Sequence, residues 1–473
     1  MTLRPLSVLA RCMVLLPVLL PALSAALLAA PAAAESPFGC TDLAGGHHLA
    51  SVEGAGGTFF RISPDLRLIH PFADETVALM ATLSDTLAAQ GTTLVYVPLP
   101  PKSLALPDAL PPEARDLGFD ATLAATLYDD ILRRLDERGV RTVNARTALR
   151  AGAGAPPTFH AADPRINATG AARLAEVIGA VLAGVPALQD LPRTRFETRA
   201  TGTVRLPSAM RAVLQRHCLI TLPEVDTATF ATTRLTAAAT TAGGALMGAG
   251  GGGARIALLG TEDAGDPSAN LAGFLAAATG LEVQSYTVTG GGAFAAISSY
   301  MTSRGFAEAR PAVIVWAVPV ADGLALTGDQ PLRELIAAAG DTCRVALAVG
   351  PGVEPGTLAI DLAGVDPGRP GMLFVDTGLA AATGIEARFL GPDGQTRSAF
   401  VRRHPDQLPS GRFLVPLDGL WPGGARQVEI RSDGGLALDA RAAACPEPLV
   451  PVALPSPPSP PAPSPPALTS GAP

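Results

Sequence analysis

The sequence predicts an α/β unit built on a parallel sheet, followed by a β-sandwich. Between residues 72 and 318, short apolar runs alternate with segments whose apolar residues recur at helical spacing. This alternation is typical of a parallel sheet covered by helices. After Cys343 the pattern changes to short alternating segments separated by turn residues, which favours a sandwich of antiparallel strands. We therefore expect the α/β unit at residues 35–342 and the β-sandwich at residues 343–445.

The first half of the α/β unit is predicted from apolar periodicity. Helices are expected at residues 72–90, 123–138 and 168–182, and strands at residues 93–97 and 140–143. The proline-rich segment at residues 98–102 should be a loop that leaves the carboxyl end of the first strand.

The second half of the α/β unit continues the alternation of strands and helices. Strands are expected at residues 255–259, 283–288 and 312–318, and helices at residues 271–278 and 293–301. A glycine-rich stretch at residues 242–254 precedes a strand and lacks the Gly-Lys-Ser/Thr end of a phosphate loop, so we interpret it as a flexible loop. Ligands of parallel sheets bind beyond the carboxyl ends of the strands. The loops after Val97, Leu259 and Val318 are therefore the expected site.

In the C-terminal part, turn residues separate short strands. The strands are expected at residues 371–376, 385–390, 411–416 and 427–430. Residues 446–473 are rich in Pro, Ala and Ser with almost no charge, which predicts an extended or disordered tail.

Residues 1–34 have the three parts of a secretory signal. Arg4 and Arg11 precede an apolar run, which ends in an Ala-x-Ala pattern before Glu35. The alternative is a permanent anchor, but Pro17 and Pro21 interrupt the run, and the small residues at its end favour cleavage. We expect an exported protein that works in the periplasm.

Four cysteines remain after the signal, and an even count in an exported protein suggests disulfides. Three pairings are possible, of which we prefer Cys40–Cys218 and Cys343–Cys445, because each then closes one structural unit. Their spacing lacks the close pairs of a zinc site, and we expect neither a metal nor a cofactor. The net charge of −7, without a basic block, argues against nucleic acid as the main partner.

Three segments carry candidate chemistry: residues 159–171 entering a helix, residues 256–263 leaving a strand, and residues 315–319 at another strand end. Together with residues 53–66, the loop at residues 97–102 and the order of the four cysteines, they resemble the AlgX/AlgJ-like family. Its members are periplasmic polysaccharide O-acetyltransferases with an SGNH-hydrolase-like, flavodoxin-like domain and a carbohydrate-binding-module-like β-sandwich.

The resemblance implies a partner and a site. The implied ligand is an anionic, alginate-like polysaccharide, and the implied protein partners are the periplasmic and inner-membrane proteins of polysaccharide acetylation and export. The family's Asp is present as Asp163, but Arg165 stands at its His position and Glu262 at its Ser position. Arginine offers no proton acceptor, so it cannot act as the base of a serine–histidine mechanism. We expect that acyl transfer is lost here and that Asp163, Arg165 and Glu262 form an ion network.

Four other residues are candidates, and three of them have a structural alternative. His160 is a possible substitute base, or an unpaired loop histidine. Ser268 is the nearest spare hydroxyl. Lys102 could contact an anionic sugar or be solvated, and Asn270 could be an oxyanion-type donor or ligand contact, or a helix N-cap.

Three functions follow. The first is a binding or scaffold protein of exopolysaccharide O-acetylation that holds polymer between the α/β cleft and the β-sandwich. The second is an active O-acetyltransferase or acetylesterase with relocated catalytic groups. The third is a structural periplasmic protein without a sugar ligand. The residues at the catalytic positions favour the first.

Overall fold

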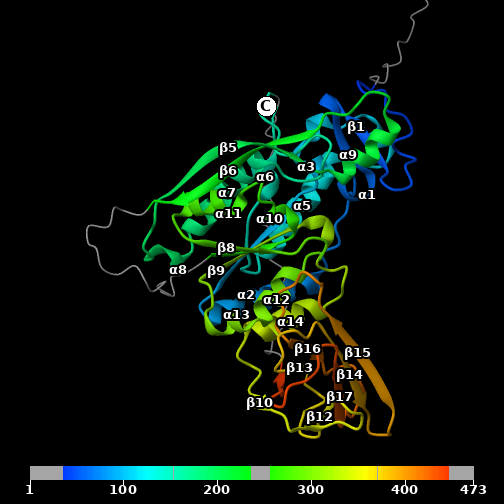
Figure 1. Ribbon diagram of the computed structural model, residues 1–473, viewed down its shortest axis with the longest axis vertical. Coiled ribbons are helices and arrows are strands. Elements are labelled where there is room, and N and C mark those ends of the chain that lie inside the picture. The colour runs from blue at the N-terminus through cyan, green and yellow to red at the C-terminus, as the bar shows by residue number, and fades with distance from the viewer. Residues whose placement is uncertain (1–35, 153, 236–255, 370, 447–473) are drawn as a thin grey trace, which may run out of the picture.

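The computed structural model describes residues 36–152, 154–235, 256–369 and 371–446 (Figure 1). The expected export signal, the glycine-rich stretch and residues 447–473 of the expected tail lie outside these ranges. Among the described residues, no helix combines the length and the apolar character that crossing a membrane requires.

A five-stranded parallel sheet forms the centre of the first unit, in the order β4-β3-β9-β7-β8. The three central strands are β3 (Thr93–Leu99), β9 (Val313–Pro319) and β7 (Ile256–Gly260), and nearly all of their residues are buried. The edges are β8 (Val283–Thr287) and β4 (Arg141–Thr142). Continuous apolar runs fit this arrangement because helices cover a parallel sheet on both faces.

Helices pack on both sides of the sheet (Figure 1). α7 (Ala168–Ala183) and α11 (Leu271–Thr279) contact each other on one side. On the other side lie α2 (Asp74–Ala89), α12 (Ala295–Thr302) and α14 (Gln330–Ala339), where α14 contacts both of the others. These helices place their buried apolar residues in one core with the central strands.

Side-chain caps fix where two helices begin. The carboxylate of Asp120 accepts the backbone N–H groups of Thr122 and Leu123 at the start of α5 (Ala121–Asp136). The side chain of Asn167 accepts the N–H of Gly170 at the start of α7. Such caps satisfy N–H groups that have no partner within the helix.

The shorter elements of this unit connect the sheet and its helices. They are β1 (Ser51–Gly54), β2 (Thr58–Arg61), α1 (Ile62–Asp65), α3 (Lys102–Ala105), α4 (Glu113–Asp116), α6 (Ala145–Leu149), α8 (Pro186–Gln189), α9 (Ala209–Leu214), α10 (Glu262–Gly265) and α13 (Arg304–Glu308).

The predicted helices and strands of the α/β unit are present, with ends that differ by a few residues. One boundary was wrong: β3 continues through Pro98 and Leu99, which pair with β9, so the loop after it is shorter than expected. The sequence also did not predict the two-stranded ribbon of β5 (Phe196–Leu206) and β6 (Val225–Arg234). Many of the ribbon's residues are polar and exposed, and they lack the apolar pattern that marks a core strand.

The C-terminal part contains two antiparallel sheets. One has the order β10-β18-β13-β16 and the other β11-β12-β17-β14-β15. Buried residues of both sheets share one core, which confirms the predicted sandwich. The strands are β10 (Val345–Ala346), β11 (Val349–Pro351), β12 (Thr357–Asp361), β13 (Gly371–Asp376), β14 (Gly384–Leu390), β15 (Thr396–Arg402), β16 (Arg412–Pro416), β17 (Gln427–Ser432) and β18 (Arg441–Pro446). Pro446, expected in the tail, is the last residue of β18.

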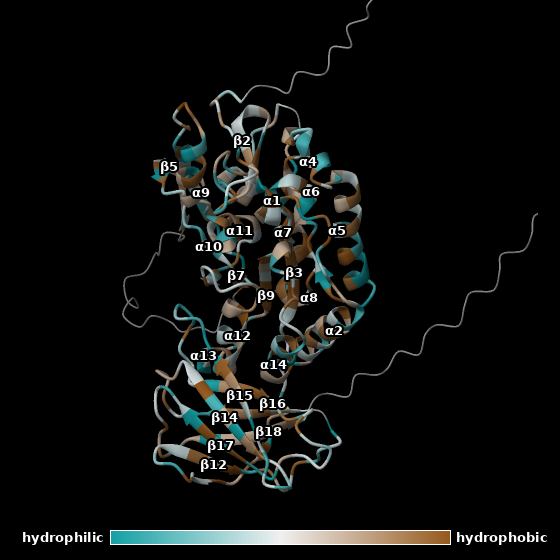
Figure 2. Ribbon diagram, turned by 90° about the vertical axis from the view of Figure 1, so that its right-hand side faces the viewer, coloured by the Kyte–Doolittle hydropathy of each residue, from teal (hydrophilic) through white to brown (hydrophobic). Residues whose placement is uncertain are grey.

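Both preferred disulfides are present, Cys40–Cys218 and Cys343–Cys445. The sandwich packs beside α12 and α14, as Figure 2 shows. Glu334 on α14 forms a buried ion pair with Arg403, which precedes β16. The exact boundary at residue 343 stays a prediction, while contacts such as this pair hold the two units together.

Candidate functional site

A cavity of about 150 Å³ opens at the carboxyl ends of β3, β7 and β9. Its walls include residues that directly follow these strands, as the sequence predicted, together with α1 and the segment before α7. The wall residues used below are Arg61, Asp65, Lys102, Arg165, Thr261, Glu262, Asp263 and Asp322.

Gly260 allows two strands to approach closely beside this cavity. A Cβ atom at residue 260 would lie 2.0 Å from the carbonyl oxygen of Ala317 on the neighbouring strand β9. No side chain fits there, so a glycine ends β7. The chain then turns through Thr261 into α10, which sets the direction of Glu262 and Asp263.

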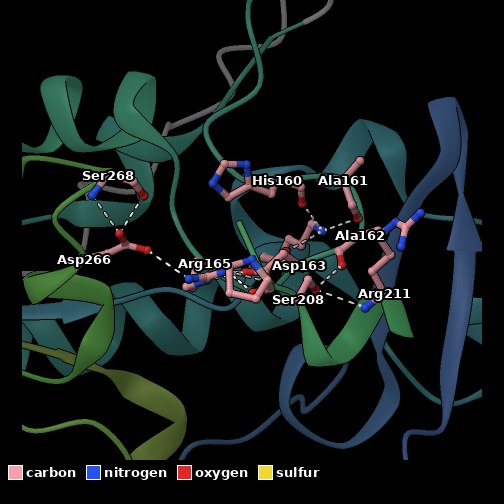
Figure 3. A network of polar contacts seen from close by, with 11 residues as sticks. His160, Ala161, Ala162, Asp163, Arg165, Ser208, Arg211, Asp266 and Ser268 are labelled. Carbon is pink, nitrogen blue, oxygen red and sulfur yellow. Dashed lines mark hydrogen bonds and ion pairs between the residues drawn. The ribbon is translucent and has the colours of Figure 1, made fainter. Parts of the chain in front are cut away.

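Arg165 is held by two carboxylates (Figure 3). Its Nε and Nη2 donate to the two carboxylate oxygens of Asp163 at 2.7 and 3.0 Å. Its Nη1 donates to Asp266 at 3.2 Å, and Nη2 also donates to the carbonyl oxygen of Pro207 at 3.0 Å. Burial opposes ionisation of Asp163, but the hydrogen bonds from Arg165 and Ser208 outweigh it and lower the pKa of Asp163. The three guanidinium nitrogens are therefore all engaged.

The predicted ion network is half right. Asp163 pairs with Arg165 as expected, but Glu262 does not, and Asp266 takes that place. Asp266 lies one helical turn after Glu262, at the end of α10, and from there it reaches the guanidinium. The carboxylate of Glu262 accepts the backbone N–H of Gly290 at 3.2 Å instead.

The cavity wall lacks the groups of a serine–histidine mechanism. Its described residues include no histidine, serine or cysteine, and its one hydroxyl belongs to Thr261. The Arg165 guanidinium is a permanent donor without a lone pair for a proton. The site can therefore bind and orient a ligand, but it offers no conventional nucleophile and base pair.

Four acidic residues line the cavity, and sequence reasoning did not single out Asp263 and Asp322 as candidates. Burial and the charge of Glu262 raise the pKa of Asp263 to about 7. The same two causes raise the pKa of Asp322. Both aspartates follow strand ends that were predicted to border the site, so their positions in the sequence could have identified them as candidates.

Lys102 holds the backbone around the cavity. It is 1% exposed, and its Nζ lies 3.0, 2.6, 2.7 and 3.3 Å from the carbonyl oxygens of Phe59, His160, Ala161 and Asp163. Burial lowers the pKa of Lys102 to about 7. These backbone contacts replace the contact with an anionic sugar that the sequence suggested for Lys102.

The other three candidates lie outside the cavity wall. His160 does not line the cavity, and burial, with a contribution from Arg165, lowers the pKa of its ring. The hydroxyl of Ser268 donates to Asp266 at 2.6 Å. Asn270 makes no side-chain cap for α11, and its amide donates to Thr232 on β6 at 3.1 Å.

Side chains that could bind a metal ion do not cluster in the described ranges. Within them, no group of three or more His, Cys, Asp or Glu side chains is arranged to hold a metal ion.

Comparisons with known proteins show the family. Residues 62–320 match the family model described as "SGNH hydrolase-like domain, acetyltransferase AlgX". The alginate biosynthesis protein AlgX of Pseudomonas aeruginosa is 28% identical over 257 residues, 54% of this chain and 53% of that protein. AlgX of Pseudomonas putida is 26% identical over 269 residues, 56% of this chain and 55% of that protein. The chain thus aligns with about half the length of these curated relatives.

The structural match covers more of the chain than the sequence alignments do. The solved structure of Pseudomonas aeruginosa AlgX superposes with a TM-score of 0.70 at 22% identity, covering 89% of this chain and 100% of that one. At this identity the superposition shows a common fold. Since the family model covers more than half of the sequence, the chain belongs to the family of SGNH hydrolase-like domains of the acetyltransferase AlgX.

Proposed function

We propose that the chain is an exported polysaccharide-binding protein of exopolysaccharide biosynthesis and O-acetylation, and that it does not perform serine–histidine acyl transfer. The observation that carries this proposal is the engagement of Arg165 by Asp163 and Asp266 at the position of the family's base. A paired guanidinium cannot accept a proton from a hydroxyl.

The binding part of the proposal is supported by the family and the fold. The curated relatives are named alginate biosynthesis proteins. An alginate-type polymer is therefore the first ligand to titrate. In this proposal the polymer is held between the α/β cleft and the β-sandwich. The expected protein partners are the periplasmic and inner-membrane proteins of polysaccharide acetylation and export, and the two disulfides suit an oxidising periplasm.

Two assays test this function. Hydrolysis of a chromogenic acetyl ester should not exceed the rate in buffer, and Glu262→Ala should leave it unchanged. Calorimetric titration of the chain with alginate and other polysaccharides should detect binding of at least one polymer. Absence of binding to every polymer tested would favour a structural protein without a sugar ligand.

A second function, acyl transfer with relocated groups, is favoured by one observation. Asp263 has a pKa of about 7 and lines the cavity, and a group that titrates near neutral pH can act as an acid or base. Ester hydrolysis that is lost in Asp263→Asn or His160→Ala, but kept in the exposed control Glu176→Gln, would establish this function instead.

A further inference from the structure

A second cavity, of about 460 Å³, lies on the sandwich sheet β10-β18-β13-β16. On the face of this sheet that is turned away from the sandwich core, α14 packs Ala337 against Met372 of β13 and Leu414 of β16. The cavity opens beside this contact, and β10, β18 and the residues next to them supply most of its wall. It is therefore separate from the cavity at the carboxyl ends of the parallel strands.

The floor of this second cavity is apolar. Ala346, Ala443 and Phe374 lie side by side on the neighbouring strands β10, β18 and β13, and all three line the cavity. The alanine side chains are small, so they leave space next to the half-buried ring of Phe374. An aromatic ring bordered by a few polar groups is the usual surface on which proteins bind the apolar face of a ligand.

The polar part of the wall is positively charged. It contains the guanidinium groups of Arg344, Arg412 and Arg441, and none of its described residues is acidic. Asp376, which is 2% exposed, accepts on Oδ2 from Nε of Arg412 at 3.1 Å and from Nη2 of Arg441 at 3.2 Å. Nη2 of Arg304 lies 3.9 Å from its other oxygen. One carboxylate cannot balance three guanidinium groups, so this side of the cavity keeps an excess of positive charge.

Two of these arginines stand at opposite ends of the apolar floor. Arg441 precedes Ala443 by two residues, Arg344 precedes Ala346 by two residues, and the two strands are antiparallel. Both arginine side chains are 72% exposed, so they are accessible to a ligand. Arg344 pairs with Asp341, which is itself exposed, and an ion pair between two exposed side chains is weak.

The combination of an aromatic floor with a guanidinium group at each end selects a ligand class. A carboxylate accepts charge-assisted hydrogen bonds from arginine, and a sugar ring offers an apolar face to Phe374. We propose that this cavity of the sandwich binds an acidic polysaccharide, with one sugar ring on Phe374 and carboxylates of different units on Arg344 and Arg441. The inference rests on the proposed function, polysaccharide binding, and gives it a site and a sugar class.

Calorimetry with the mature, disulfide-bonded chain at pH 7 and low salt tests the inference. The probes are an oligouronate and its methyl ester of equal length, which lacks the negative charge. The oligouronate should bind about tenfold more tightly, and the double variant Arg344→Gln with Arg441→Gln should abolish this difference. Arg199→Gln with Arg205→Gln removes the same charge from exposed residues of the β5–β6 ribbon and should keep it. Phe374→Leu, which keeps an apolar side chain, should weaken both forms several-fold.

A single variant guards against misfolding. Arg344→Gln leaves no buried charge without a partner, because Asp341 is exposed, and it should weaken the oligouronate about threefold. Equal binding of the two forms, or oligouronate binding as tight in the double variant as in the ribbon control, overturns the inference and leaves polysaccharide binding as the proposed function. If neither form and no polymer binds, the proposed function fails together with the inference.

Discussion

Asp263 gives the cavity a pH dependence with a definite sign. Burial and the charge of Glu262 raise its pKa from the ordinary 3.8 to about 7. Between about pH 4 and pH 7 the unfolded chain has therefore lost a proton that the folded chain keeps. Stability falls as pH rises through this window, and the penalty is fully present above pH 7. Asp263→Asn removes the charge and should stabilise the protein at pH 8.

The magnitude follows from the same values. Each pH unit between the two pKa values adds about 1.4 kcal/mol, which gives an upper limit of about 4 kcal/mol. Asp263 is only half-buried and borders an open cavity, so solvent reduces this to about 1–2 kcal/mol. Such a gain corresponds to an increase in Tm of about 2–6 °C. Thermal unfolding followed by circular dichroism at pH 4 and pH 8 measures it.

The comparison between the two pH values is decisive. At pH 4 the carboxyl group of Asp263 is protonated in the folded chain and only about half ionised in the unfolded chain, so little of the penalty is present and Asp263→Asn should change the Tm little. The exposed Asp190→Asn is the matched control and should have no effect at either pH. The reasoning is refuted if Asp263→Asn lowers the Tm at pH 8, or raises it equally at both pH values.

Three further variants test contacts at the site, within the sandwich and between the two units. Lys102→Met removes the donor to four carbonyl oxygens and should lower the free energy of unfolding by about 3–5 kcal/mol, measured in urea. Removing Cys343–Cys445, which spans 102 residues, should cost about 2–5 kcal/mol, measured as the unfolding midpoint of the sandwich. Glu334→Gln leaves Arg403 buried without its carboxylate and should cost about 3 kcal/mol, seen as faster proteolysis between the units.

The sequence predicted the fold well where one physical signal dominated. The central strands are continuous apolar runs because both faces of the sheet are covered, and β3, β7 and β9 were found for that reason. The ribbon of β5 and β6 was missed because its exposed threonines and charges do not form an apolar pattern. Its strands are defined by pairing with each other, which sequence spacing does not show.

The sequence predicted where the site lies better than it predicted which side chains contact one another there. The pairing of Asp163 with Arg165 is local, two residues apart, and was foreseen. The contact of Arg165 with Asp266 joins residues 101 positions apart and depends on where α10 ends. Lys102 was predicted either to contact an anionic sugar or to be solvated, and the sequence could not show its burial, because only the folded chain brings the four carbonyl oxygens around it.

The central claim is that a chain with Arg165 and Glu262 at the family's catalytic positions binds polysaccharide without acyl transfer. The most direct measurement is acetate release from a chromogenic acetyl ester by the purified mature chain, with a bound polysaccharide present. The account predicts a rate equal to that in buffer, and no change on Glu262→Ala. Release well above the buffer rate that disappears in Glu262→Ala would contradict it.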